Sequence, residues 1–231
     1  MLSERVDAIR HKIATNCQYA GREPSSVRLI AVSKTFPAEK VREAFACGLR
    51  DFGENYTDEL VDKQEALQDL KNIRWIFIGQ LQSNKIQKIM RAADEIQSIA
   101  SEKHARYIDR YAREFGKKNF PVWIVVNAGN EDTKQGVSFT DLPVLADFIT
   151  KNCAHLRLQG IMAIPPAEFC DPKPASQEKN TVPALYASLR NAASGIGLGK
   201  LSLGMSNDLA LAIFAGTDCV RIGSSIFGER K

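Results

Sequence analysis

The strongest constraint on the fold is the alternation of short apolar runs with helix-like runs along all 231 residues. Eight apolar runs have the length of strands: 28–34, 51–55, 74–79, 95–100, 121–129, 156–164, 200–205 and 219–228. Helix-like runs follow seven of them: 37–46, 57–70, 83–93, one that ends at Gly116, 140–152, 178–193 and 207–215. A further helix precedes the first strand, with Val6, Ile9, Ile13 and Cys17 on one face.

The strand-like runs are apolar throughout, as in a parallel sheet covered on both faces. Their alternation with helices is typical of a (β/α)8 TIM-type barrel or an open doubly wound sheet, and we predict the barrel. We expect the N-terminal helix to cover the wall left bare because the last strand lacks a following helix. Nothing indicates a linker, so we expect residues 1–231 to form a single domain. Residues 165–180 are Pro-rich and polar, which predicts a mobile loop.

Composition excludes several classes of protein. Net charge is +4, and no basic stripe with interleaved aromatics indicates nucleic-acid binding. No apolar run reaches membrane-spanning length, and the N-terminus lacks the apolar core of a signal peptide. The five cysteines form no C-x-x-C pair, which favours reduced thiols over a disulfide frame or a zinc site. We expect a cytoplasmic protein without a metal, with Cys17 and Cys47 as small buried hydrophobes.

In a (β/α)8 barrel, chemistry lies at the C-terminal ends of the strands. The residues predicted there are Lys34, Glu54, Asn55, Gly79–Asn84, Asn127, Met162–Pro165, Gly204–Asn207 and Gly223–Ser225. The loops after the seventh and eighth strands are rich in glycine and serine, and the seventh leads directly into a helix. This composition favours a phosphate site on these two loops, although glycine and serine also form ordinary tight turns.

Lys34 ends the first strand, which in a closed barrel neighbours the eighth. Its amine can therefore reach a ligand whose phosphate lies on the last two loops. We expect a partly desolvated site near Arg221 to lower the pKa of this amine, which would favour the neutral nucleophile that forms a Schiff base. An isolated strand-end lysine is alternatively a surface or ion-paired residue. Phosphate plus an imine-forming lysine indicates pyridoxal phosphate (PLP), or a cofactor-free aldolase acting on a sugar phosphate.

Seven segments carry a family resemblance: AVSKTFP, FGENY, FIGQLQSNK, KQGV, GIMAIP, LSLGMSND and VRIGSSIFGER. In this order they resemble the signature segments of the pyridoxal-phosphate homeostasis protein family, whose fold is similar to the barrel domain of bacterial alanine racemase. The resemblance implies that Lys34 holds pyridoxal 5′-phosphate as a Schiff base. It also implies the other cofactor-binding residues: Ser206, Gly223 and Ser224 at the phosphate, Arg221 at the pyridine nitrogen, and Asn55 and Met205 along the pocket.

Two positions bear on the chemistry that the resemblance implies. Arg221 stays protonated, so a ring nitrogen facing it remains unprotonated and the ring is a weaker electron sink. Alternatively, Arg221 is a phosphate ligand or a surface ion-pair residue. Ile76 stands where the family has a histidine, and its mid-strand position predicts a core residue.

Racemisation needs acids or bases on both faces of the bound substrate, and Lys34 serves only one. We expect His11, His104 and His155 to lie away from the working face, and Tyr56 to pack over the pocket. We therefore predict no catalytic residue and a PLP-binding protein of vitamin B6 homeostasis. The alternative is a PLP-dependent, racemase-like enzyme.

The resemblance also directs expectations about partners. We expect apo PLP-dependent enzymes as acceptors of the cofactor, no nucleic-acid or membrane partner, and a monomer. Lys85 and Lys134 lie near the predicted working face, where they either attract the cofactor's phosphate during loading or are simply solvated.

Overall fold

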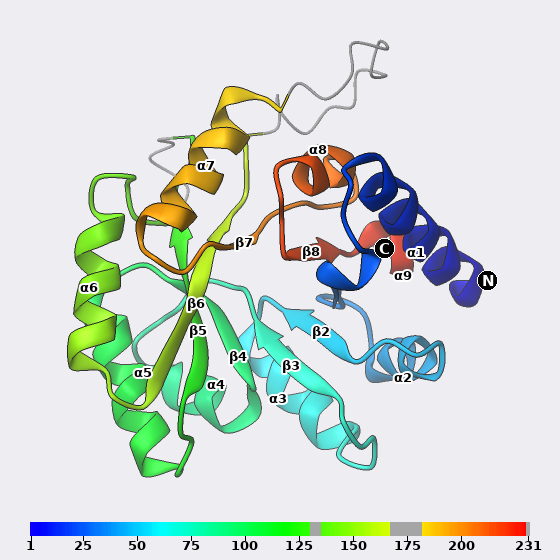
Figure 1. Cartoon of the computed structure of the whole chain (residues 1–231). Helices are drawn as coiled ribbons and strands as arrows, with labels where there is room; N and C mark the ends of the chain where they lie inside the picture. The colour runs from blue at the N-terminus through cyan, green and yellow to red at the C-terminus, as the bar shows by residue number, and fades with distance from the viewer. Residues whose placement is uncertain (130–134, 167–181, 230–231) are drawn as a thin grey trace.

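A computed structural model describes residues 1–129, 135–166 and 182–229. In this part of the chain, eight parallel strands close into a barrel in sequence order (Figure 1). The strands are β1 (Arg28–Val32), β2 (Asp51–Glu54), β3 (Arg74–Phe77), β4 (Glu95–Ile99), β5 (Phe120–Val126), β6 (Leu156–Ala163), β7 (Lys200–Ser202) and β8 (Cys219–Ile222). Because β1 pairs with β8, the barrel prediction is confirmed and the open sheet was wrong.

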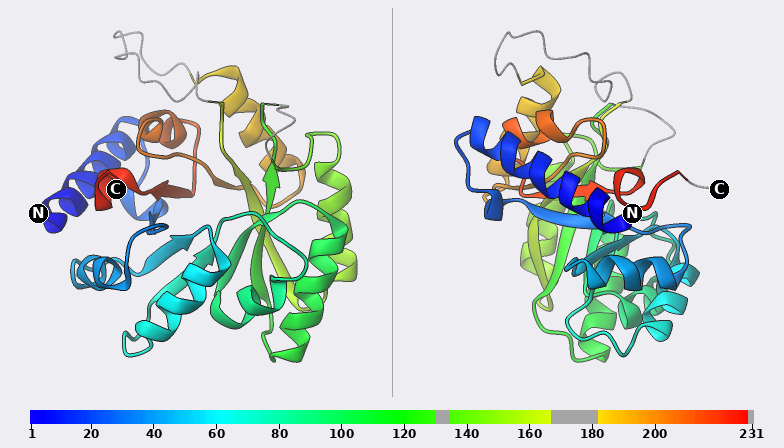
Figure 2. Two further views of the ribbon diagram at one scale, coloured as in Figure 1. Left: turned by 180° about the vertical axis from the view of Figure 1, so that it is seen from behind. Right: turned by 90° about the vertical axis from the view of Figure 1, so that its right-hand side faces the viewer.

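The helices lie around the outside of the barrel (Figure 1). They are α1 (Leu2–Tyr19), α2 (Ala38–Ala46), α3 (Thr57–Ala66), α4 (Ile86–Ala92), α5 (Glu102–Glu114), α6 (Leu142–Asn152), α7 (Ala184–Gly195), α8 (Leu209–Phe214) and α9 (Ser224–Phe227), with a short 3-10 turn, η1 (Pro24–Ser26). As predicted, α1 covers the closing wall: it lies alongside α8 and α9 in both views of Figure 2. Its buried stripe is the predicted one, Val6, Ile9, Ile13 and Cys17.

Some predicted boundaries were wrong. The run 219–228 is not all strand: β8 ends at Ile222, and residues 224–227 form the one-turn helix α9. The last strand therefore does have a helix after it, although one too short to cover the wall alone. The helix predicted over 57–70 ends at Ala66, and the next residues turn through a bond from Leu70 N–H to the Leu67 carbonyl.

A layer of apolar side chains lies inside the barrel. Ile30, Ile76, Trp123 and Cys219 form this layer, and each is buried. Ile76 is thus a core residue, as predicted. A side chain buried here contributes about 1.5–3 kcal/mol relative to exposure, so this layer stabilises the strands whose ends carry the candidate site.

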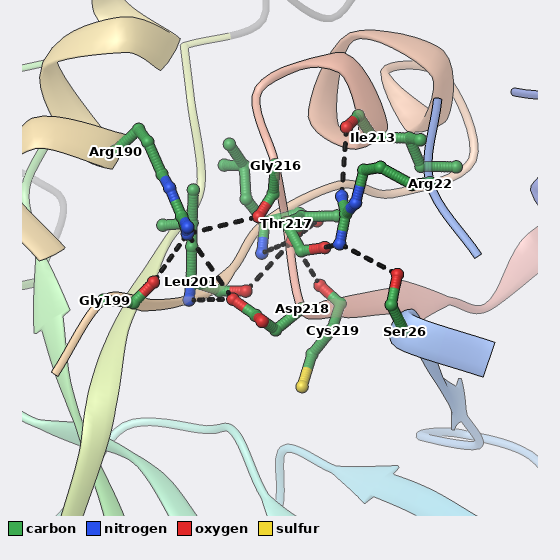
Figure 3. Close-up of polar contacts among 11 residues, drawn as sticks. Arg22, Ser26, Arg190, Gly199, Leu201, Ile213, Gly216, Thr217, Asp218 and Cys219 are labelled. Carbon is green, nitrogen blue, oxygen red and sulfur yellow. Dashed lines mark hydrogen bonds and ion pairs between the residues drawn. The ribbon is translucent and has the colours of Figure 1, made fainter. Parts of the chain in front are cut away.

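The loop before β8 is fixed by a cluster of polar contacts around Thr217 (Figure 3). The Thr217 hydroxyl oxygen accepts from Leu203 N–H at 3.0 Å and lies 2.8 Å from the Cys219 carbonyl. From one side Arg22 donates to the Thr217 carbonyl at 2.8 Å, and from the other Arg190 donates to the Gly216 carbonyl at 3.2 Å. These contacts join the segment after α1, helix α7 and the loop before β8 to Leu203, the residue that follows β7.

The remaining sequence predictions concern cysteines and loops. Cys17 is buried as predicted, whereas Cys47 is only half-buried because it stands just past the end of α2. Cys170, residues 167–180 of the predicted loop and the start of the helix predicted at 178–193 lie outside the described residues. In the part of the chain described, no helix combines the length and apolarity needed to cross a membrane.

Candidate functional site

A pocket of about 250 Å³ opens at the carboxyl ends of the strands. It is lined by Val32, Lys34, Asn55, Ile78, Met162, Ile164, Met205, Ser206, Asn207, Arg221, Gly223 and Ser224. All seven residues that the sequence assigned to a cofactor are in this lining. Closure of the barrel explains the convergence, because it places the end of β1 beside the loops after β7 and β8.

The backbone on the amino-terminal side of Lys34 is held by a buried ion pair. The Lys63 amine, from α3, donates to the Ser33 carbonyl at 2.8 Å and to Glu54 Oε1 at 2.7 Å. The Ser33 hydroxyl donates to the same Glu54 oxygen at 2.6 Å. Ser33, Glu54 and Lys63 are all buried, so these bonds fix the peptide unit that precedes Lys34.

The backbone on the other side of Lys34 is fixed as well. Thr35 has a φ of 68°, a left-handed conformation that is rare for a β-branched residue. Its N–H donates to Glu59 Oε2 at 2.7 Å, and the Lys63 amine donates to the same oxygen at 2.9 Å. We call Glu54, Glu59 and Lys63 the clamp. It constrains the chain on both sides of Lys34 and leaves the lysine side chain to line the pocket.

Burial raises the pKa of Glu54, and the neighbouring Lys63 ammonium opposes that shift. One oxygen of this carboxylate, Oε2, is buried without a hydrogen-bond partner among the described residues. Its charge is therefore balanced mainly by Lys63, and removal of that amine would leave a buried negative charge unpaired.

Arg221 brings a buried positive charge to the pocket. Its guanidinium donates to the Ser202 carbonyl and hydroxyl, each at 2.8 Å, and to the Ala163 carbonyl at 2.7 Å. These partners are neutral. Burial lowers the pKa of Arg221 to about 10, so the group stays protonated at neutral pH. A buried cation with neutral partners favours an anionic or electron-rich ligand in the adjoining pocket.

The orientation of Arg221 is supported by a chain of hydrogen bonds through the barrel. The Ser202 hydroxyl donates to Gln97 Oε1 at 2.8 Å, and Gln97 Nε2 donates to Glu95 at 2.6 Å. Glu95 in turn accepts from Arg28 at 2.5 Å. Because Gln97 donates to Glu95, its oxygen faces Ser202, and the serine oxygen keeps a lone pair to accept from Arg221.

The loop after β7 is shaped by one glycine and one carboxylate. Gly204 has a φ of 105°, and a Cβ there would approach the Ala212 Cβ to 2.6 Å, so a larger residue does not fit. The buried Asp208 carboxylate accepts from Met205 N–H at 2.6 Å and from the Tyr186 hydroxyl at 2.8 Å. This loop brings the Ser206 hydroxyl to 3.3 Å from that of Ser224.

The other residues singled out from the sequence lie elsewhere. None of the three histidines lines the pocket: His11 is on α1, His104 on α5, and His155 precedes β6, 3.3 Å from Asp109. Tyr56 is next to Asn55 but is exposed and outside the lining. Lys85 forms an exposed ion pair with Asp58 at 3.2 Å. Lys134 lies outside the described residues.

Sequence reasoning missed the supports behind the pocket. Lys63 belongs to a polar helix, where its spacing from Glu59 is equally typical of a solvent-exposed i,i+4 ion pair. Gln97 and Ser202 looked like ordinary strand residues. The signal that could have revealed them is the presence of polar residues, Gln97 and Ser202, in strands expected to be buried on both faces. A buried polar side chain needs a hydrogen-bond partner, so such a residue indicates a further polar group nearby.

The chemistry available is an amine beside a buried guanidinium and a pair of hydroxyls. Of the described lining residues, only Lys34 and Arg221 have ionisable side chains. Their positive charges and the Ser206 and Ser224 hydroxyls suit a phosphate-bearing ligand, and the lysine amine suits a carbonyl carbon. Within the described residues, no group of three His, Cys, Asp or Glu side chains could hold a metal ion.

Comparison with known proteins places this site in a family. The family model for the N-terminal domain of alanine racemase matches residues 5–231. The pyridoxal phosphate homeostasis protein of Pseudomonas aeruginosa is 41% identical over 231 residues, covering 99% of this chain and 96% of that protein. The protein of the same name from Caenorhabditis elegans is 38% identical over 221 residues, which cover 92% of this chain and 89% of that protein.

Solved structures of similar proteins support the same fold and family. PipY of Synechococcus elongatus, determined with PLP bound, aligns with a TM-score of 0.81 at 32% identity, covering 99% of this chain and 100% of that one. Alanine racemase of Streptomyces coelicolor aligns with a TM-score of 0.71 at 16% identity over 57% of its own chain, which supports the fold alone. The chain therefore belongs to the pyridoxal phosphate homeostasis protein family, within the larger group that shares the barrel domain of alanine racemase.

Proposed function

We propose that this protein binds pyridoxal 5′-phosphate in the pocket, with Lys34 as the covalent attachment point, and takes part in vitamin B6 homeostasis. The observation that carries the proposal is the convergence of Lys34, Arg221 and the Ser206–Ser224 hydroxyl pair in one pocket. The full-length relatives named for PLP homeostasis, and PipY with PLP bound, support the same conclusion.

The residues present fit the cofactor. Ser206, Gly223 and Ser224 would receive its phosphate, since they line one side of the pocket and the two hydroxyls lie 3.3 Å apart. Arg221 would face the ring nitrogen and donate a hydrogen bond to it, a role that suits a buried guanidinium whose hydrogen-bond partners among the described residues are neutral. Asn55 and Met205 would line the ring.

When bound, PLP supplies an aldehyde that reacts reversibly with amines. Lys34 would supply the amine, and the clamp holds the backbone on both sides of it, so attachment costs little backbone conformational entropy. Because the pKa of Arg221, about 10, lies above that of a pyridine nitrogen, Arg221 would keep its proton and the ring nitrogen would only accept a hydrogen bond from it. The described lining residues thus favour holding the cofactor over stabilising a carbanion.

A trapping experiment tests the attachment. Purified protein loaded with PLP is reduced with borohydride, digested and mapped by peptide mass, with Lys34→Ala as the matched variant. We expect the label on Lys34 and its loss in the variant. A label that persists elsewhere at full stoichiometry would contradict the assignment.

Delivery is a second part of the proposal. We propose that the protein acts in the cytoplasm as a monomer and passes PLP to apo PLP-dependent enzymes. Transfer to an apo-enzyme faster than spontaneous release supports this role, and transfer at the rate of spontaneous release contradicts it. Size-exclusion chromatography with light scattering tests the monomer.

The competing enzymatic function has its own test. A racemase-like enzyme exchanges the α-hydrogen of an amino acid in D₂O much faster than free PLP does. We expect no exchange above that of free PLP, because the described lining offers Lys34 alone as a proton-transfer group.

A further inference from the structure

A second chamber adjoins the cofactor pocket over the ends of β3 to β6. It holds about 220 Å³ and shares four lining residues with the pocket: Asn55, Ile78, Met162 and Ile164. Typical sites for drug-sized ligands are about 300–1,000 Å³, so this one is of fragment size. None of the pocket residues assigned to the phosphate or to the ring nitrogen is in its lining.

The polar side chains in the described lining of this chamber are all uncharged. They are four carboxamides and one hydroxyl: Asn55, Gln80, Asn127, Gln135 and Ser98. Ile78, Val125 and Met162 add an apolar wall. An anionic ligand would lose its hydration here without gaining a cation from the described lining, which is costly. The lining therefore favours a neutral ligand with both hydrogen-bonding and apolar parts.

Two buried polar atoms in this lining have no partner among the described residues, Ser98 Oγ and Asn55 Oδ1. Ser98 is only 3% exposed. A buried hydroxyl or amide oxygen without a hydrogen-bond partner costs about 1–3 kcal/mol of the free energy of unfolding. Such atoms are therefore uncommon in native structures, and a bound ligand is one way to satisfy them. The serine hydroxyl can donate and accept, whereas the amide oxygen accepts only. A ligand that satisfies both must bring at least one N–H or O–H donor.

An irregularity in β4 accompanies the position of Ser98. Ile96 pairs with Val122 and Ile99 with Ile124, so β4 uses one more residue than β5 between the same two points. Such a bulge re-aims side chains and is frequent beside functional sites. Here Gln97 bonds to the Ser202 hydroxyl that supports Arg221, while its neighbour Ser98 lines the chamber.

We propose that this chamber is a binding site for a small primary carboxamide with a short alkyl part, beside the proposed cofactor pocket. The carboxamide N–H groups donate to Asn55 Oδ1 and Ser98 Oγ, its oxygen accepts from the Ser98 hydroxyl or a lining amide, and its alkyl group packs on Ile78 and Met162. Because four residues line both spaces, a cofactor in the pocket and a ligand in the chamber contact the same side chains. This last point rests on the proposed function.

The test uses propionamide and its near-isosteric anion, propionate, titrated into the cofactor-free full chain and followed by protein NMR. We expect saturable shifts around Ser98 with propionamide and affinity at least about threefold weaker with propionate. Ser98→Ala should weaken propionamide binding by about 3- to 10-fold, the loss of one hydrogen bond. Ser194→Ala, an exposed serine on α7, should leave binding unchanged.

A second variant covers the case in which Ser98→Ala perturbs folding. Val125→Phe narrows the chamber and should abolish propionamide binding. Equal affinity for propionate and propionamide, or undiminished binding in these variants, would overturn the proposal. PLP is titrated separately: failure of PLP to bind contradicts the proposed function and leaves the chamber result standing. With PLP bound, propionamide should bind at least about fivefold tighter. By thermodynamic linkage, bound propionamide should raise the affinity for PLP by the same factor.

Discussion

Replacement of Lys63 by methionine tests whether the clamp behind Lys34 acts as a unit. Lys63 is buried, and its amine bonds to the Ser33 carbonyl, Glu54 and Glu59 at 2.7–2.9 Å. Methionine keeps most of the volume and removes the charge. Breaking a buried ion pair in this way costs about 3–5 kcal/mol of the free energy of unfolding. We therefore expect Lys63→Met to lower stability by that amount at about pH 7.5, measured by urea denaturation.

The pH dependence gives a sharper signature than the magnitude. The pKa of Glu54 is raised in the folded protein by burial, and loss of Lys63, which opposes the shift, raises it further. For a carboxyl with a raised folded pKa, the stability it contributes is complete below the unfolded pKa and is lost as pH rises through the folded pKa. The destabilisation should therefore be largest at about pH 7.5 and smaller at about pH 5.

Two further variants complete the test of the clamp. Adding Glu54→Gln to Lys63→Met removes the unpaired buried charge of the Glu54 carboxylate and should recover part of the lost stability. Lys151→Met breaks an exposed helical pair with Asp147 and should cost less than about 0.5 kcal/mol. If Lys63→Met costs no more than this control, or if its cost does not change with pH, the reasoning about the clamp is refuted. Weaker PLP binding in Lys63→Met, measured by fluorescence, would connect the clamp to Lys34.

Three other predictions follow from the same contacts. Arg221→Met leaves the Ser202 and Ala163 carbonyls without this buried donor and should cost about 1–3 kcal/mol in urea, while PLP affinity falls at least about tenfold in a fluorescence titration; unchanged affinity contradicts the role of Arg221. Gln97→Leu leaves Glu95 and Ser202 without their partner and should cost about 1–3 kcal/mol in urea, and a neutral result would mean that the chain through the barrel contributes little. Thr217→Val should cost about 1–3 kcal/mol through its lost hydroxyl bonds; unchanged stability in urea would contradict a structural role for these bonds.

The sequence predicted the barrel because the strand-like pattern is repeated eight times, and an error in the bounds of one strand does not change the fold. It also brought together six of the seven predicted cofactor residues, since parallel closure puts every strand end on one face, whereas the role of Arg221, within β8, came from the family resemblance. It failed where a short segment was decided by tertiary contacts. Residues 224–227 are apolar enough to continue the strand, yet they turn into α9 against α1.

The supports behind the site could not be predicted for a different reason. Whether Lys63 is a solvated helix residue or the buried partner of Glu54 depends on how α3 rotates against β2, which the period of a polar helix does not determine. The bulge in β4, which accompanies Gln97 inside the barrel and Ser98 in the chamber lining, leaves no mark in the sequence. Supporting residues of this kind can be identified only from their contacts in the three-dimensional structure.

The most direct test of the central claim is the position of the covalent label after PLP loading and borohydride reduction. We predict one label per chain, on Lys34, together with a visible absorbance band before reduction that is absent in Lys34→Ala. A wild-type protein that remains colourless, or a label that maps to another lysine with Lys34 unmodified, would contradict the account.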